Sequence, residues 1–233
     1  MTHFIPTAVT KKLSLAVLCL AATSAMAASL ADLSNLDATS GLKAALERGA
    51  VAAVGKLGAE NGFLHNDQVK IGLPRVLEKA RPLLNMTGQG ERLDELVLDM
   101  NHAAEMAVPL AKPLLIKAVK SLTVRDAKLI LSGGDTSVTD FFREKTSGEL
   151  ALQFLPIVKK VTDRSDLSAK YNGAMGKVGR FSAIPPEQAT VEDYVTHKAV
   201  DGLFKMIAEE ERDIRRDPIG TGSKILSKVF GSL

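Results

Sequence analysis

Hydrophobic residues recur at spacings of three and four over most of the chain, which is the pattern of helices that bury one face. The stripes are clearest in residues 41–57, 91–107, 138–161 and 191–216. One short run, Val69, Ile71 and Leu73, instead alternates as a strand does. Because a single strand would have no ladder partner, we expect this run to be an extended linker. The pattern predicts an all-α protein, an irregular single-domain multi-helix bundle with about seven to nine helices, some of them kinked.

Capping residues and helix breakers divide this pattern into elements. Pro109 and Pro113 interrupt one helical stripe and Pro156 another, so we expect breaks or kinks there. The pair Gly133–Gly134 predicts a left-handed helix C-terminus. The longest helix is expected over residues 191–216, with its charged second half at the surface. Helix starts are predicted at Ser40, Pro74, Thr123 with Asp126, Asp135, Ser165 or Asp166, Thr190 with Asp193, and Ser223.

The first 27 residues have the organisation of a cleaved signal peptide. Lys11 and Lys12 precede an apolar run over residues 13–22, and residues 25–27 (Ala-Met-Ala) place small residues ahead of a cut before Ala28. We therefore expect export to the periplasm and a single mature domain over residues 28–233. The competing interpretation is an amphipathic or buried N-terminal helix.

The cysteine content bears on the same prediction. Cys19 is the only cysteine, and it lies inside the apolar run of the signal peptide. Leu18 stands where a lipoprotein signal has a small residue, so we do not expect lipidation. The mature domain is then disulfide-free and offers no thiol to a metal or a substrate.

Composition argues against some classes of partner. The chain is 45% hydrophobic and 24% charged, as globular domains are, but only 4% aromatic and without tryptophan. Platforms that stack aromatic rings on single-stranded nucleic acid are therefore disfavoured. Removal of Lys11 and Lys12 lowers the net charge from +3 to about +1, so we expect no nucleic-acid partner.

Several short phrases are specific enough to carry a family resemblance. They are Gly62-Phe63-Leu64, Ser132-Gly133-Gly134-Asp135, Phe142-Arg143-Glu144-Lys145-Thr146, Tyr171-Asn172 with Met175-Gly176, Asp193-Tyr194-Val195-Thr196, Asp201-Gly202-Leu203-Phe204, and the run from Met206 to Glu211. With these phrases, residues 41–230 resemble the bacterial domain-of-unknown-function family numbered 4197. The resemblance implies an exported helical protein of unknown activity. It supplies no catalytic residue that can be assigned to this chain.

Motifs for metal binding and catalysis are weak. Asp99, His102 and Glu105 share one helix face, at a spacing that a metal site can use. That face lies opposite an apolar stripe, so we interpret it as solvated and expect no metal and no other cofactor. Nucleophilic catalysis lacks its motifs, because there is no G-x-S-x-G sequence and no mature cysteine. No glycine-rich run has the spacing of a phosphate loop, and residues 220–223 are more typical of a turn.

One constellation is a candidate site for a polar ligand. We expect Arg143 to lie within salt-bridge range of Glu209 or Glu210, because the phenylalanines before it must reach the core. An arginine–carboxylate network beside tyrosines suits bidentate recognition of a polar ligand. The competing interpretation is a structural ion pair between two helices. The candidate residues are Arg143, Glu144, Tyr171, Tyr194, Glu209 and Glu210. Glu211 and Arg215, four residues apart, are interpreted as an ordinary helix-surface pair.

The sequence is compatible with three functions. The first is a periplasmic binding or interaction protein without catalysis, whose partner is an unknown protein or a small polar ligand. The second is a hydrolase or other enzyme with a site built across helices, for which a deep pocket combining the candidate residues would be the sign. The third is an apolar-ligand or lipid binder, for which an unfilled cavity would be the sign. The last segment, with Lys224 and Lys228 among apolar residues, is expected either to pack on its own bundle or to make weak contact with a membrane surface.

Overall fold

A computed structural model of the chain describes residues 39–88, 90–164, 167–178 and 188–217. Within these ranges the ordered elements are all helices and no strand occurs, which confirms the all-α fold. The first helix covers residues 39–57. The others are α2 (Arg75–Met86), α3 (Gly90–Ala107), the short 3-10 helix η1 (Val108–Leu110), α4 (Ala111–Ser121), α5 (Val124–Ser132), α6 (Ser137–Arg164), α7 (Leu167–Val178) and α8 (Val191–Arg216).

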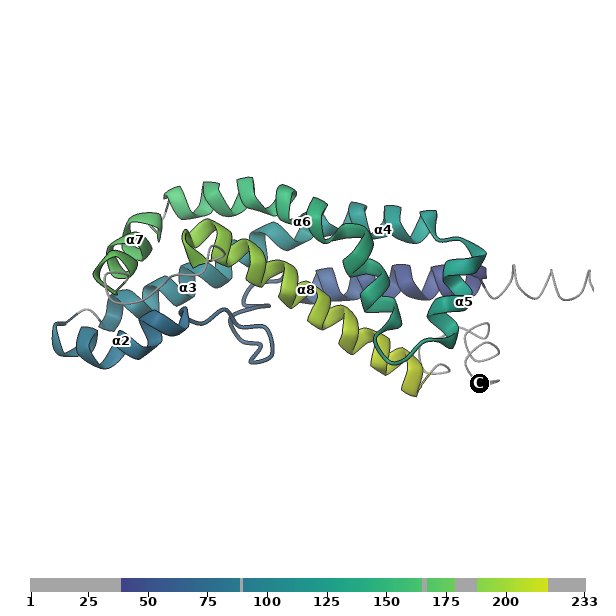
Figure 1. Cartoon of the computed structure of the whole chain (residues 1–233), viewed down its shortest axis with the longest axis horizontal. Coiled ribbons are helices and arrows are strands. Elements are labelled where there is room, and N and C mark those ends of the chain that lie inside the picture. Colours follow the sequence, from purple (N-terminus) through teal and green to yellow (C-terminus); the bar gives the residue numbers. More distant parts are fainter. Residues whose placement is uncertain (1–38, 89, 165–166, 179–187, 218–233) are drawn as a thin grey trace, which may run out of the picture.

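The helices form an elongated bundle, with α2 and α7 at one end and α5 at the other (Figure 1). α6 and α8 run through the middle (Figure 1) and pack more extensively against each other than any other pair among the helices from α2 to α8. The helix over residues 39–57 lies antiparallel to α4, since Lys43 Nζ donates to Lys120 O at one end. At its other end, a Cβ added to Gly58 would lie 3.0 Å from Pro109 Cγ.

The long central helix α8 has the bounds that the sequence predicts. Thr190 caps it, with its hydroxyl oxygen accepting from the Asp193 N–H at 3.1 Å. Its apolar stripe is buried, including Leu203 and Phe204 at 0% exposure. At 1.5 Å per residue the helix is about 39 Å long, enough to act as the spine of the bundle.

A glycine in α8 allows one close contact on which the core depends. A Cβ at Gly202 would lie 2.7 Å from Cε1 of Phe63, a fully buried ring from the turn after the first helix. We expect Gly202→Ala to lower the free energy of unfolding by about 2 kcal/mol, because the ring must move out of a filled core. Gly148 in α6 is the matched control, since nothing lies within 4 Å of its added Cβ.

In urea unfolding, Gly148→Ala should leave the protein as stable or raise its stability by about 0.5 kcal/mol, through better helix propensity. A Gly202→Ala variant as stable as Gly148→Ala would show that Phe63 does not need this space.

Several predicted helix boundaries are wrong, each for a local reason. The first helix already exists at residue 39, so Ser40 lies inside it rather than capping it. Gly133 ends α5 in an extended conformation, with φ −81°, instead of a left-handed one. A Cβ at this position would lie 2.5 Å from Ser137 Cβ. Glycine therefore allows the end of α5 to approach the start of α6 closely. Asp135 does not supply the cap of α6, which comes from Glu211 on α8.

Other boundaries are confirmed. Thr123 and Asp126 form the reciprocal capping box of α5. The stripe that Pro109 interrupts breaks into η1 between α3 and α4, as predicted. At the other two prolines no helix ends, since α4 contains Pro113 and α6 contains Pro156. The signal peptide, the starts at Ser165 or Asp166 and at Ser223, and the final segment lie outside the described residues. No helix within the described ranges is long and apolar enough to cross a membrane.

Candidate functional site

The expected pair between Arg143 and Glu209 or Glu210 does not form. Arg143 Nη1 lies 3.4 Å from Asp201 Oδ1, and its guanidinium carbon lies 4.7 Å from the centre of the Phe204 ring. Glu210 pairs with Lys56 Nζ at 2.5 Å. Asp201 precedes Glu209 by eight residues, about 12 Å along α8, so α6 crosses α8 two turns earlier than the sequence suggested.

Glu144 also lies apart from the other candidates. It pairs with its neighbour Lys145 at 3.0 Å, and its side chain is 74% exposed. Exposed pairs of this kind contribute little to stability, because water competes for both charges. Glu209 is half-buried and helps, with Glu210 as the main partner, to raise the pKa of Lys56. The structure therefore does not gather Arg143, Glu144, Glu209 and Glu210 around one ligand.

The two tyrosines do come together, as a buried pair. The rings of Tyr171 and Tyr194 stack with centroids 6.4 Å apart. Tyr171 donates its hydroxyl to Gln188 O at 2.8 Å, and Tyr194 donates to Gly72 O at 2.9 Å. Burial raises the pKa of both phenols, that of Tyr194 to about 12. The pair joins α7 and α8 to the chain segment around Gly72.

The raised pKa values predict alkaline sensitivity. A phenol in the unfolded chain ionises near pH 10, whereas the folded Tyr194 retains its proton until about pH 12. The contribution of this buried phenol to the free energy of unfolding is therefore complete below pH 10. It is lost as the pH rises towards 12, because in this range only the unfolded state releases the proton. We expect the absorbance of tyrosinate at about 295 nm to rise together with loss of helical circular dichroism. Ionisation near pH 10 with the helix signal intact would contradict the buried pair.

The segment that contains Val69, Ile71 and Leu73 is bonded to a side chain of α3 that the sequence did not indicate as its partner. Val69, in a turn, and Ile71 and Leu73, in the irregular segment after it, are all buried with 8% exposure or less, whereas the sequence predicted only an extended linker. Asn101 of α3, fully buried, accepts from the Ile71 N–H at 2.8 Å and donates to Ile71 O at 2.8 Å. Its amide also donates to Val97 O at 2.7 Å. One side chain thus replaces the neighbouring strand that the run lacks, which fixes the segment against α3.

Glu105, one turn further along α3, holds the preceding turn in the same way. Its carboxylate accepts from the backbone N–H groups of Asn61, Phe63 and Leu64 at 3.0–3.2 Å. With 6% exposure it is buried, so the predicted solvated face of Asp99, His102 and Glu105 is wrong for Glu105. Among the residues that the structure describes, no three His, Cys, Asp or Glu side chains are placed to hold a metal ion.

These anchors create the wall of an open cleft between α2, α3 and the segment from residue 64 to 73. Its volume is about 740 Å³, within the range of roughly 300–1,000 Å³ typical of ligand sites. The apolar lining is Leu64, Leu73, Val97 and Leu98, and the charged lining is Lys70, Glu78, Arg81, Glu91, Asp94 and Glu95. Tyr194 is the one predicted site residue that contributes, because its bond to Gly72 O holds the wall.

The charges at the rim are only partly paired. Arg81 donates to both Asp94, at 2.8 Å, and Glu78, at 3.0 Å, and these bonds raise its pKa, that to Asp94 most. Glu95 pairs with Lys170 of α7 at 3.2 Å. Glu91 makes no ion pair within the described residues. With Lys170 counted, four carboxylates meet three cations, so the cleft has a small excess of negative charge beside its apolar lining.

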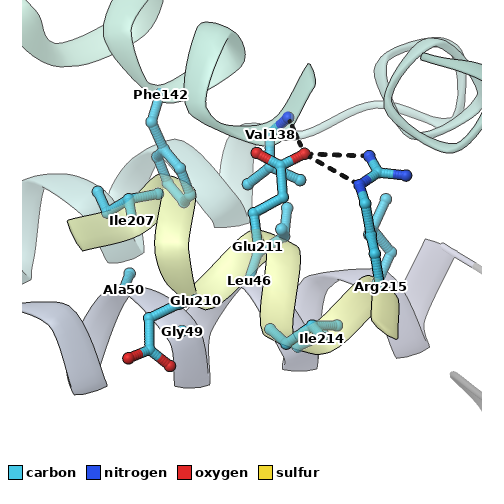
Figure 2. Close-up of a pocket in the computed structure, with 12 residues that line it drawn as sticks. Leu46, Gly49, Ala50, Val138, Phe142, Ile207, Glu210, Glu211, Ile214 and Arg215 are labelled. Atoms are coloured by element: carbon cyan, nitrogen blue, oxygen red, sulfur yellow. Dashed lines mark hydrogen bonds and ion pairs between the residues drawn. The ribbon is translucent and has the colours of Figure 1, made fainter. Parts of the chain in front are cut away.

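A second cavity lies between the first helix, α6 and α8 (Figure 2). Its walls are mainly apolar, with Leu46, Phe142 and Ile207 all buried. The cavity has a volume of about 20 Å³, room for one water molecule, whereas an engineered cavity that accepts benzene measures about 150 Å³. This cavity therefore gives no support to the apolar-ligand alternative.

The polar end of this cavity contains the most heavily bonded carboxylate in the described part of the chain. Glu211 accepts from the Val138 N–H at 3.0 Å, and from the Thr139 N–H and hydroxyl at 3.0 and 2.9 Å. It pairs with Arg215 at 3.0 Å, and Arg215 also donates to Ser137 Oγ at 2.6 Å. Figure 2 shows the bonds of Glu211 with Val138 and Arg215. A carboxylate of α8 thus caps α6, which neutralises its first N–H groups. The predicted Glu211–Arg215 pair is confirmed, but it lies inside the protein rather than on its surface.

Comparison with known proteins identifies a family and no activity. A family model described as "Protein of unknown function (DUF4197)" matches residues 32–231. No curated protein matches the chain. No solved structure matches it either.

Proposed function

The chain belongs to the DUF4197 family of proteins of unknown function, and we propose that it is an exported, non-catalytic binding protein whose partner occupies the cleft between α2 and α3. The observation that carries the proposal is the exposed Leu98, which is 40% accessible and lines a cleft of ligand size. An apolar side chain exposed in a concave, charged site favours burial against a partner.

The wall of the cleft supports binding in a second way. Asn101 and Tyr194 fix the backbone at Ile71 and Gly72 through three hydrogen bonds of 2.8–2.9 Å. A wall that is already ordered loses little conformational entropy when a partner arrives, and such preorganisation raises affinity. Both anchors come from helices, which position a site more rigidly than loops do.

The geometry gives the enzyme alternative less support. That alternative expects one deep pocket to combine the candidate polar residues. Arg143 contacts Asp201, Glu210 contacts Lys56, and the tyrosines donate to backbone oxygens, so these groups serve separate contacts. A depression of about 540 Å³ between α5 and α6 contains Glu144, but none of the other candidates lines it.

Export is the part of the proposal that rests on residues 1–27 alone. We expect the protein recovered from the cell envelope to begin at Ala28, because the residues before it have the order of a cleavable signal. Intact-mass measurement tests this. A chain that retains Met1, or one that begins at a lipid-modified Cys19, would contradict it.

Site-specific crosslinking in the producing cell tests binding in the cleft. A photoreactive phenylalanine analogue at position 98 should give a discrete crosslinked product after irradiation. The matched control is position 152 on α6, where Leu152 is 75% exposed but lines none of the three cavities described. Equal products from both positions, or none from position 98, would contradict the proposed function.

A further inference from the structure

We propose that the occupant of the cleft is a basic segment of a partner protein, with lysine or arginine side chains at the rim and an apolar side chain on Leu98. This inference rests on the proposed binding function and adds the chemical class of the partner. It follows from the charges, the apolar lining and the length of the cleft taken together.

The α3 side of the cleft presents a row of residues suited to such a segment. Glu91, Asp94, Glu95 and Leu98 line the cleft together, at the spacings that place residues on one helix face. The lining has four carboxylates against two cations. Arg81 bonds to two of the carboxylates and Lys170, from outside the lining, pairs with Glu95, so Glu91 is the lining carboxylate without an ion pair among the described residues. An incoming cation near Glu91 gains attraction without displacing an existing ion pair.

The apolar lining distinguishes a peptide from a simple cation. Leu98 continues the acidic row, and Val97 and Leu73 lie beside it in the lining. A small hydrated cation would leave Leu98 exposed to water, whereas a leucine-sized side chain would cover it and gain roughly 25 cal/mol for each Å² buried. Apolar cover also strengthens the neighbouring charge pairs, because it excludes water from them.

The dimensions fit a short extended chain. Residues 91 and 98 are seven apart, or about 10.5 Å along a helix. An extended peptide rises about 3.3 Å per residue, so three to four residues span this row. The cleft is open, which allows the partner chain to continue beyond it.

Fluorescence anisotropy with defined probe peptides tests the inference on the mature protein. The main probe is a labelled peptide of alternating lysine and leucine, compared with a glutamate–leucine peptide and a lysine–serine peptide of equal length. We expect the lysine–leucine peptide to bind most tightly, and its affinity to fall as salt is raised. Each variant below is checked for folding by circular dichroism.

Matched substitutions place the binding in the cleft. Glu91→Lys should weaken the lysine–leucine peptide about tenfold, the effect of a reversed charge close to the bound cation. Glu149→Lys, at an exposed position of α6 outside the cleft, should change affinity less than twofold. Leu98→Ser should weaken binding and Leu152→Ser should not.

The outcomes separate the partner class from the binding function. If Glu149→Lys weakens binding as much as Glu91→Lys, attraction is general to the surface and the inference is overturned. Equal binding of the glutamate–leucine peptide, lost in Leu98→Ser, would overturn the basic partner but leave the cleft as a binding site. Absence of crosslinking at position 98 in cells would overturn both.

Discussion

Replacing Glu211 with glutamine is expected to lower the free energy of unfolding by about 3 kcal/mol. The carboxylate side chain is 1% exposed and uses both oxygens, one towards Val138 and Arg215 and the other towards Thr139. Glutamine has nearly the same shape but only one acceptor oxygen. Its amide N–H₂ would face either the Arg215 guanidinium or the donors of Thr139, and a buried donor left without an acceptor costs about 1–3 kcal/mol.

The expected loss also has an electrostatic part. Arg215 has a side chain only 15% exposed, so removing its carboxylate leaves a largely buried cation with hydrogen bonds to Ser137 Oγ and Ile130 O but without this counter-charge. Breaking one side of a buried pair commonly costs about 3–5 kcal/mol. The first turn of α6 also loses the negative charge that complements its helix dipole.

Glu144→Gln is the control for this substitution, because it removes the same charge from an exposed position on α6. We expect it to change stability by less than about 0.5 kcal/mol. Urea unfolding of both variants, followed by circular dichroism, gives the comparison. If Glu211→Gln lost no more stability than Glu144→Gln, the cap on α6 would not be a structural requirement.

Local sequence signals predicted the parts of the fold that depend on near neighbours. The bounds of α8 follow from the Thr190 cap and from a stripe with helical spacing. The capping box of α5 is complete within four residues, from Thr123 to Asp126. The alternation of Val69, Ile71 and Leu73 predicted a linker outside the helices, and residues 70–74 do lie outside them, although Val69 belongs to a turn in which its N–H donates to Asn66 O.

Contacts between distant residues account for what the sequence did not predict. The carboxylate of Glu211 caps a helix that begins more than 70 residues earlier, and Glu105 binds a turn more than 40 residues away. Such pairings depend on how the helices are arranged, which the spacing of residues within one helix does not encode. Arg143 was assigned to the correct partner helix but to a carboxylate two turns too far along it.

A signal for the buried polar residues was nevertheless present. Glu211 continues the apolar row Leu203–Ile207 at the next i+4 position, so it stands where a core residue is expected. Asn101 and Glu105 continue from Val97 in the same way on α3. A charged or amide side chain in a core row is buried only when its hydrogen bonds are met. A prediction that Asn101 and Glu105 are buried and hydrogen-bonded would have identified both residues of α3 that hold the cleft wall.

Asn101→Leu should be the second strongly destabilising substitution, lowering the free energy of unfolding by about 3 kcal/mol. Leucine has a similar volume and keeps the site filled, so the effect isolates the hydrogen bonds rather than a cavity. The Ile71 N–H and carbonyl would both lose their partner in a fully buried place, at about 1–3 kcal/mol each. Part of the loss is offset because leucine gains favourable apolar burial.

The neighbouring His102→Leu is the control, since it makes the same kind of change on α3 at a position that is only half-buried. Its stability should stay within about 1 kcal/mol of wild type. Because Ile71 lies between Lys70 and Gly72, which line the cleft, Asn101→Leu should also weaken binding of the lysine–leucine peptide under conditions where the variant is still folded, and His102→Leu should not. A folded Asn101→Leu variant that binds the peptide as wild type does would show that the wall keeps its position without this side chain, and that the ordered segment around Gly72 does not depend on pairing with α3.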